Sequence, residues 1–152
     1  MALIVKNEYV ASEITGNIIG SAMEVHTRLG PGFLESVYEQ ALAVELGLKK
    51  IKFERQKPLP VFYRGKIIKN FTCDFLVDSQ IIVELKAVKE IAEIDRLQVI
   101  NYLKASGIEI GLLLNFGGQS LEYKRLINSK NKNHNNQFNH CNQFESAKSV
   151  IC

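Results

Sequence analysis

Apolar residues recur at two different periods along the chain, and the change of period separates predicted helices from predicted strands. Spacings of three and four residues are typical of helices with one buried face. They predict helices over residues 11–29, 34–46 and 92–106. A glycine follows each of these runs, at Gly30, Gly47 and Gly107, which is typical of helix ends.

Between the helices, alternating or continuously apolar runs predict strands. They lie at residues 49–56, 59–63, 67–77, 81–88, 110–116 and 121–127, with Lys57-Pro58 separating the first two. Short turns imply antiparallel hairpins, whereas the helix between 81–88 and 110–116 implies a parallel pair. The expected fold class is therefore α/β (α+β mixed), with a central mixed β-sheet flanked by helices.

The length of 152 residues fits one domain, which we expect to span residues 1–127. Residues 128–152 are rich in asparagine and have few apolar anchors, which predicts a disordered tail. His134, His140 and Cys141 in this tail match no zinc-binding spacing. The three cysteines of the chain are irregularly spaced, which argues against a disulfide framework.

The sequence also predicts a soluble, cytoplasmic protein without a membrane segment. No apolar run is long enough to span a bilayer. Acidic residues come too early at the N-terminus for a signal peptide.

Positive charge is concentrated in residues 49–69, which contain eight lysines and arginines and one acid, Glu54. A basic stretch of this kind can follow a phosphate backbone. The alternative is a set of lysines that guard solvated strand edges, which is common. Charge by itself favours neither interpretation.

Three charged residues stand in a predicted hairpin where apolar residues would be expected. Glu84 and Lys86 are two residues apart and therefore share one face of their strand. A three-residue loop would pair Val77 with Ile81, and this register places Asp74 opposite Glu84. A two-residue loop would send Asp74 to the other face.

Opposed carboxylates repel one another, but they suit a divalent cation such as Mg²⁺, which prefers oxygen ligands. A neighbouring lysine can hold an attacking water or neutralise charge on a phosphate. Asp74, Glu84 and Lys86 are thus a candidate set for metal-assisted phosphodiester hydrolysis. The alternative is a solvated ion pair of Glu84 and Lys86 on an outward sheet face.

Polar residues of the predicted helices could join this set. Glu35 lies in the first turn of the second helix, where an acid is also favourable for the helix dipole alone. Gln98 and Tyr102 are four residues apart on the third helix, where they could bind a phosphate or form an ordinary surface stripe. His26 could support the site from behind its direct ligands, but a helix-packing role is the favoured interpretation.

The segment GFLESVY, with Gly32, Glu35 and Tyr38, contains the Gly-x-x-Glu-x-x-Tyr motif. By this resemblance the chain is identified as a member of the GxxExxY family, which is similar to the PD-(D/E)XK nuclease superfamily. The similarity runs from about residue 13 to residue 127, through VHTRLGPGFLESVYEQAL, FERQKPLPVFYRGK, CDFLVDSQIIVELKAV, QVINYL and GLLLNFG. It implies a restriction-endonuclease-like core of α-β-β-β-α-β.

The resemblance also implies roles for the hairpin residues. Asp74, Glu84 and Lys86 match the D…(D/E)xK motif. Asp74 and Glu84 would hold Mg²⁺ together with the backbone carbonyl of Leu85, and Lys86 would position or activate the water. Cys73 stands where the motif's name has proline, a position that varies in the superfamily.

The helical residues receive roles in the same way. Glu35 matches an acid that some members supply from the helix before the sheet, to support a metal-bound water or a second metal. Gln98 and Tyr102 match the Gln-x-x-x-Tyr of RecB-like nucleases, where they would orient the phosphate.

The expected function is therefore a Mg²⁺-dependent nuclease, with Mn²⁺ as an alternative cofactor. DNA is favoured over RNA, and residues 49–69 would contact its backbone. The alternative is a non-catalytic module on the same fold that binds nucleic acid or protein. The small size of the chain also leaves room for a protein partner or a homo-oligomer.

Overall fold

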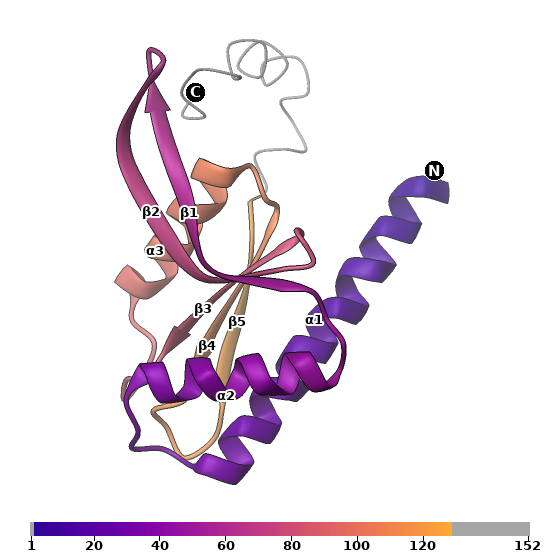
Figure 1. Ribbon diagram of the computed structural model, residues 1–152, viewed down its shortest axis with the longest axis vertical. Helices are drawn as coiled ribbons and strands as arrows, with labels where there is room; N and C mark the ends of the chain where they lie inside the picture. Colours follow the sequence, from indigo (N-terminus) through magenta and orange to yellow (C-terminus); the bar gives the residue numbers. More distant parts are fainter. Residues whose placement is uncertain (1, 129–152) are drawn as a thin grey trace.

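The computed structural model describes residues 2–128, which form one mixed sheet flanked by helices (Figure 1). In chain order the elements are α1 (Ala2–Leu29), α2 (Glu35–Leu48), β1 (Phe53–Tyr63), β2 (Lys66–Val77), β3 (Ile81–Lys86), α3 (Glu93–Ser106), β4 (Ile110–Asn115) and β5 (Glu122–Ile127). The strand order is β1-β2-β3-β4-β5, with β3 and β4 parallel and the other neighbours antiparallel. The predicted fold class is confirmed, and α2 to β4 form the α-β-β-β-α-β core, to which α1 and β5 are added.

Apart from Asn128, the predicted tail lies outside the described residues, and so do His134, His140 and Cys141. The domain boundary therefore stays a prediction. Cys73 is a buried free thiol. Within residues 2–128 no helix is long and apolar enough to cross a membrane.

Several element boundaries differ from those predicted. Gly47 does not end α2, which continues to Leu48, and β3 ends at Lys86, two residues earlier than predicted. The two strands expected on either side of Lys57-Pro58 are one strand, β1, which lies at an edge of the sheet. Proline lacks the N–H group that a central strand needs, but at an edge that group would face solvent. Helix α1 begins at Ala2 instead of residue 11, and residues 2–10 contain neither glycine nor proline to stop it.

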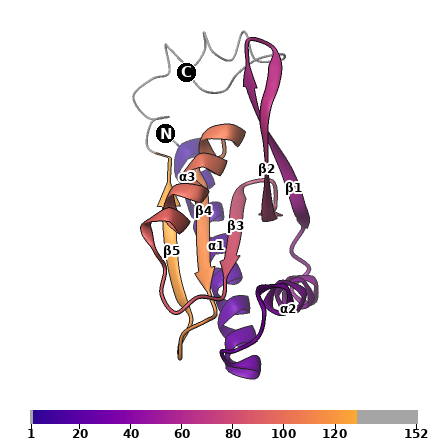
Figure 2. The same cartoon turned by 90° about the vertical axis from the view of Figure 1, so that its left-hand side faces the viewer.

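The sheet separates two apolar cores, one on each face (Figure 2). The core beneath α1 and α2 includes Ile18, Ala22, Tyr38, Leu42, Phe75, Val83, Leu85 and Phe116. The core beneath α3 includes Leu59, Val61, Cys73, Ile82, Val99, Leu103 and Leu113. Because side chains alternate along a strand, Glu84 and Lys86 of β3 lie on the α3 side with Ile82.

The β1–β2 hairpin changes the face that it buries partway along its length. Phe53 and Phe75 belong to the core under α1 and α2, whereas Leu59 and Cys73, an even number of residues away, belong to the α3 core. Regular strands keep such residues on one face, so the hairpin twists between them. Gln56 lies in this interval with a φ of 48°, a left-handed value that is uncommon outside glycine. Beyond the twist, the hairpin extends past the rest of the sheet (Figures 1 and 2).

The loop between α1 and α2 is fixed by two residues of the Gly-x-x-Glu-x-x-Tyr motif. The hydroxyl of the buried Tyr38 donates to the Gly30 carbonyl oxygen at 2.6 Å and accepts from the Phe33 N–H at 3.2 Å. Gly32 has a φ of 110°, which glycine adopts without steric cost. Both residues orient the start of α2, where Glu35 lies.

His26 is buried beside this loop, as its predicted packing role requires. Its Nε2 lies 2.9 Å from the Gly118 carbonyl oxygen. Its ring stacks on Phe116, which also stacks on Tyr38. His26 therefore joins α1 to the loop after β4.

Gly111 of β4 leaves no room for a side chain, because a Cβ there would lie 2.6 Å from Val99 Cγ1 of α3. We expect Gly111→Ala to displace α3 and to lower the free energy of unfolding by about 1–3 kcal/mol. The control is Gly16→Ala in α1, where a Cβ meets nothing within 4 Å and alanine favours the helix. Urea unfolding measures both variants, and equal stabilities would contradict the close approach of α3 to β4.

Candidate active site

Strands β2 and β3 pair over only a short length. The register predicted from the three-residue loop, Val77 with Ile81, is confirmed, and pairing continues as far as Phe75 and Val83. Beyond this point β2 is paired with β1, and β3 with β4. Because the hairpin twists away from β3 here, the next residues, Asp74 and Glu84, are not paired with each other in the β2–β3 ladder.

Asp74 and Glu84 replace the missing ladder contacts with side-chain hydrogen bonds. The Asp74 N–H donates to Glu84 Oε2 at 3.2 Å, and the Leu85 N–H donates to Asp74 Oδ2 at 2.8 Å. Each carboxylate thus accepts a hydrogen bond from the backbone of the strand that carries the other acid. These bonds hold the two carboxylates close together. Glu84 is 5% exposed and Asp74 is half-buried, so the predicted acid pair lies largely out of solvent.

Burial makes both acids difficult to ionise. It raises the pKa of Glu84 to about 8, and the charge of Asp74 adds to the rise. Burial also raises the pKa of Asp74, although hydrogen bonds from Leu85 and Gln56 oppose it. A cation beside the carboxylates would remove this cost, so the pair has the charge and the oxygen atoms of a divalent-metal site.

Lys86 follows Glu84 on the same face of β3 and is held there by α3. Its Nζ lies 3.8 Å from Asp95 Oδ1, and both side chains are mostly buried. Asp95 Oδ2 accepts the Ala92 N–H at 2.9 Å, which fixes the carboxylate at the start of α3. Asp95 was not predicted from the sequence, because an acid in the first turn of a helix is common and only the fold brings it to Lys86.

A second connection that the sequence did not reveal joins Asp74 to α2. Gln56 Nε2 donates to Asp74 Oδ1 at 3.2 Å and to Glu39 Oε1 at 3.1 Å. Arg55 Nη2 donates to the same Glu39 oxygen at 3.0 Å. Consecutive residues of a regular strand point in opposite directions, so the left-handed φ of Gln56 is what lets both reach Glu39. Glu39 lies one turn after Glu35, and this spacing was the available signal.

Glu35 lies near the acid pair on the first turn of α2. Loss of hydration raises its pKa, the charge of Asp74 adds to the rise, and Lys86 opposes it, so these charges lie within electrostatic reach. Among residues 2–128, no three His, Cys, Asp or Glu side chains form a group that could hold a metal ion. Glu35 is therefore not grouped with Asp74 and Glu84 as a direct ligand, and its role stays a prediction.

Gln98 and Tyr102 are hydrogen-bonded to each other on the face of α3 that packs against the β1–β2 hairpin. Gln98 Nε2 donates to the Tyr102 hydroxyl at 2.8 Å. The Tyr102 ring packs against Phe71 of β2 and is 4% exposed, so it is not part of a solvated surface stripe. Burial, followed by the charge of Glu84, raises the pKa of the Tyr102 hydroxyl. The hydroxyl therefore stays protonated and lies within electrostatic reach of the acid pair.

The mixed sheet with helices on both faces is consistent with a restriction-endonuclease-like fold. The model of the PD-(D/E)XK nuclease superfamily matches residues 12–126, and the chain belongs to that superfamily. No curated protein and no solved structure matches the chain.

The raised pKa of Glu84 predicts how stability depends on pH in metal-free buffer. The unfolded carboxyl ionises near pH 4.5 and the folded one near pH 8, so the folded state binds the proton more tightly between these values. Its stabilising contribution is complete below about pH 4.5 and is lost as the pH rises to about 8. We expect the free energy of unfolding to fall by roughly 2–4 kcal/mol over this range.

Urea unfolding in EDTA between these pH values measures this loss. Glu84→Gln cannot ionise, so its stability should depend much less on pH. The control is Glu109→Gln, an exposed acid between α3 and β4, which should keep the slope of the wild type. Identical slopes for wild type and Glu84→Gln would mean that Glu84 ionises without a folding cost.

Proposed function

We propose that the protein is a metal-dependent nuclease that hydrolyses phosphodiester bonds, with DNA as the preferred substrate. The observation that carries the proposal is the buried pair of Asp74 and Glu84 beside Lys86, in a chain of the PD-(D/E)XK nuclease superfamily. The Gly-x-x-Glu-x-x-Tyr motif supports the GxxExxY family as the finer assignment. A cytoplasmic location is part of the same proposal.

Asp74, Glu84 and the Leu85 carbonyl oxygen would hold Mg²⁺ or Mn²⁺, and all three supply the hard oxygen atoms that these ions prefer. In a strand, the carbonyl and N–H of one residue point to the same edge, and the Leu85 N–H already bonds Asp74. When bound, the cation supplies positive charge to the phosphate and makes water a better nucleophile at neutral pH. Glu35 would add negative charge from α2.

Lys86 is proposed to position the attacking water or to neutralise the phosphate. Its ion pair with Asp95 orders the side chain before a substrate arrives, so less conformational entropy is lost on binding. Gln98 and Tyr102 are proposed to orient the phosphate, because an amide and a protonated hydroxyl can both donate to its oxygen atoms.

The second candidate is a non-catalytic module on the same fold that binds nucleic acid or protein. Exposed apolar residues of α2 and its preceding loop favour a protein partner or a homo-oligomer, and they include Phe33, Leu34, Val44 and Leu48. In such a module Glu84 would simply remain protonated. Metal binding distinguishes the two candidates.

Mn²⁺ or Mg²⁺ should stabilise the wild type, because a ligand that binds only the folded state raises the melting temperature. At saturating metal we expect a rise of about 5 °C, and none for the double variant Asp74→Asn, Glu84→Gln. The matched control, Asp78→Asn with Glu109→Gln, removes two carboxylates outside the pair and should keep the full rise. A metal-dependent rise in the Asp74/Glu84 variant would place the metal elsewhere.

The cleavage assay uses single-stranded, double-stranded and branched DNA and RNA, with Mg²⁺, Mn²⁺ or EDTA. We expect metal-dependent cutting that falls at least about 100-fold in Asp74→Ala and in Lys86→Ala. Lys89→Ala, an exposed lysine after β3, is the control.

The two measurements together separate the candidates. Metal binding without cutting on any substrate would favour an enzyme that needs a partner. The absence of both metal binding and cutting would favour the binding module.

A further inference from the structure

Beyond its twist, the β1–β2 hairpin is a two-stranded ribbon whose strands pair only with each other. β2 pairs with β3 only from Phe75 onward, so its earlier residues are paired with β1 alone. The turn at Arg64-Gly65 has φ values of 48° and 81°, which is typical of tight hairpin turns. Both views show the ribbon extending beyond the rest of the sheet and beyond α3 (Figures 1 and 2).

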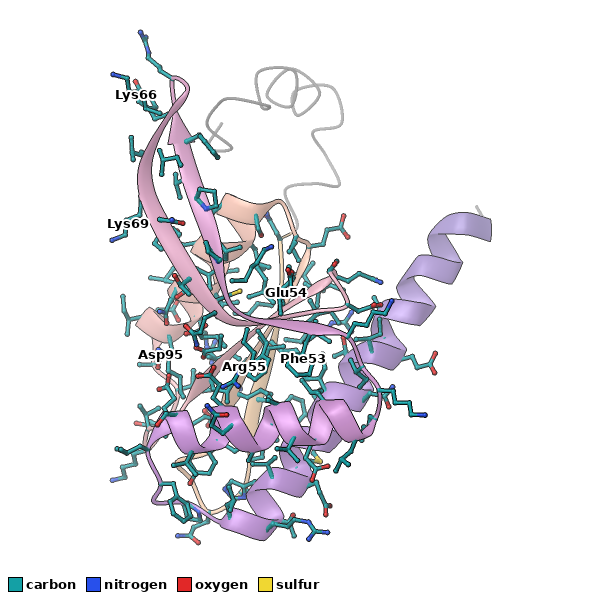
Figure 3. All side chains as sticks on the ribbon, viewed as in Figure 1. Phe53, Glu54, Arg55, Lys66, Lys69 and Asp95 are labelled. Atoms are coloured by element: carbon teal, nitrogen blue, oxygen red, sulfur yellow. The ribbon has the colours of Figure 1, made fainter. Side chains whose placement is uncertain are left out.

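The ribbon tip carries cations that have no acidic partner. Arg64, Lys66 and Lys69 are exposed, and none of the ion pairs within residues 2–128 includes them. Lys66 and Lys69 point away from the body (Figure 3). Nearer the base, Arg55 and Lys57 are already paired with acids. Within the basic segment 49–69, Arg55 and Lys57 thus have acidic partners, whereas Arg64, Lys66 and Lys69 of the tip are in no ion pair among residues 2–128.

The same tip exposes large apolar side chains on both of its faces. Tyr63, Ile67 and Ile68 are 57%, 58% and 59% exposed. Ile67 and Ile68 are consecutive in a strand, so they project to opposite faces of the ribbon. A flat partner surface would cover only one of them, whereas a groove with two walls would contact both.

We propose that this ribbon enters the major groove of double-stranded DNA. The major groove of B-form DNA admits a two-stranded β-ribbon, whereas that of A-form RNA is too deep and narrow. The cations would meet phosphates on the groove walls, and the isoleucines would meet sugars and thymine methyl groups. The inference deepens the proposed nuclease function and rests on it, because the acid pair at the ribbon's base is taken as the cleavage site.

The ribbon also fixes the distance between the cations at its tip and Asp74, because Lys66, Lys69 and Asp74 all lie on β2. Lys66 precedes Asp74 by eight residues and Lys69 precedes it by five. At about 3.3 Å per residue these separations are roughly 26 Å and roughly 17 Å. They correspond to about 5–8 base pairs of duplex. A substrate would therefore need a duplex arm of this length on one side of the cleaved bond.

Binding is tested first, by fluorescence anisotropy of labelled duplex DNA in EDTA, so that the result does not depend on cleavage. We expect Lys66→Ala with Lys69→Ala to weaken binding about tenfold and to reduce the salt slope by about 2. The matched control, Lys124→Ala with Arg125→Ala, removes two exposed cations from β5, at the opposite edge of the sheet. It should bind as the wild type does.

The apolar contacts are tested with Ile67→Ser and Ile68→Ser, singly and together. Groove insertion predicts that each single change weakens duplex binding and that the double variant is weakest. All these residues are exposed, so circular dichroism melting should show unchanged folds. A loss from only one of the two isoleucines would overturn insertion in favour of contact with a flat surface.

The distance is tested by cutting duplexes whose arm on one side of the cleaved bond is shortened stepwise from about 12 to about 3 base pairs. Wild-type cutting should fall once the arm is shorter than about 5–8 base pairs, whereas the Lys66/Lys69 variant should cut all lengths equally slowly. No length dependence would overturn the inference and leave the nuclease intact.

Two further outcomes are decisive. Duplex binding through the tip without any cutting would support the ribbon's role while the proposed nuclease activity fails. A wild type that does not bind duplex DNA, or that forms dimers which the isoleucine variants lose, would assign the tip to protein contact and overturn the inference.

Discussion

The hydrogen bond from the Leu85 N–H to the Asp74 carboxylate is the interaction on which the site depends. In an uninterrupted sheet, a backbone carbonyl of β2 would accept this N–H and the two strands would remain in register. The ladder instead ends at Phe75 and Val83, and the carboxylate takes the place of the carbonyl. Asp74 is thereby held beside Glu84 at the point where the β2–β3 pairing ends, between α2 and α3.

Where β2 separates from β3, the β1–β2 hairpin becomes a two-stranded ribbon that is anchored to the rest of the domain at one end only. An isolated two-stranded ribbon is only marginally stable in water. Here its middle section packs Leu59, Val61 and Phe71 with Tyr102 of α3. This packing stiffens the ribbon without covering its tip. Phe71, which anchors the ribbon, and Asp74, which belongs to the site, lie three residues apart on the same strand, β2.

Local rules in the sequence were sufficient for most of the fold and for the acid pair. The three-residue loop determines the register of Val77 with Ile81, and alternation then determines the faces of Asp74 and Glu84. The continuous β1 was missed because a proline breaks a strand only where its missing N–H would be needed, and sequence does not reveal which strand lies at the edge.

The supporting contacts could not be predicted, because they are non-local. The left-handed Gln56 carries no signature of its own, since glutamine is not a residue that favours positive φ. Nothing in the sequence distinguishes Asp95 and Glu39 from other acids on helix surfaces. Only the fold places Asp95 beside Lys86 and Glu39 beside Gln56. Sequence spacing therefore identified the groups that face each other across a hairpin, and it did not identify the groups that hold them there.

Charge is distributed unequally over the acids around the site. Asp95 has Lys86 as its partner, and Glu39 has Arg55, whereas no ion pair within residues 2–128 includes Asp74 or Glu84.

The donors around the acid pair favour different protonation states. Asp74 accepts hydrogen bonds from the Leu85 N–H and from Gln56, and both donors favour its ionised form. Glu84 accepts one bond, and burial raises its pKa to about 8, so it holds a proton more tightly than a free carboxyl group does. A divalent cation that bound there would displace this proton, because a metal ligand must be deprotonated. The affinity of the site for metal therefore depends on how tightly Glu84 holds its proton. Both depend on how deeply the fold buries Glu84.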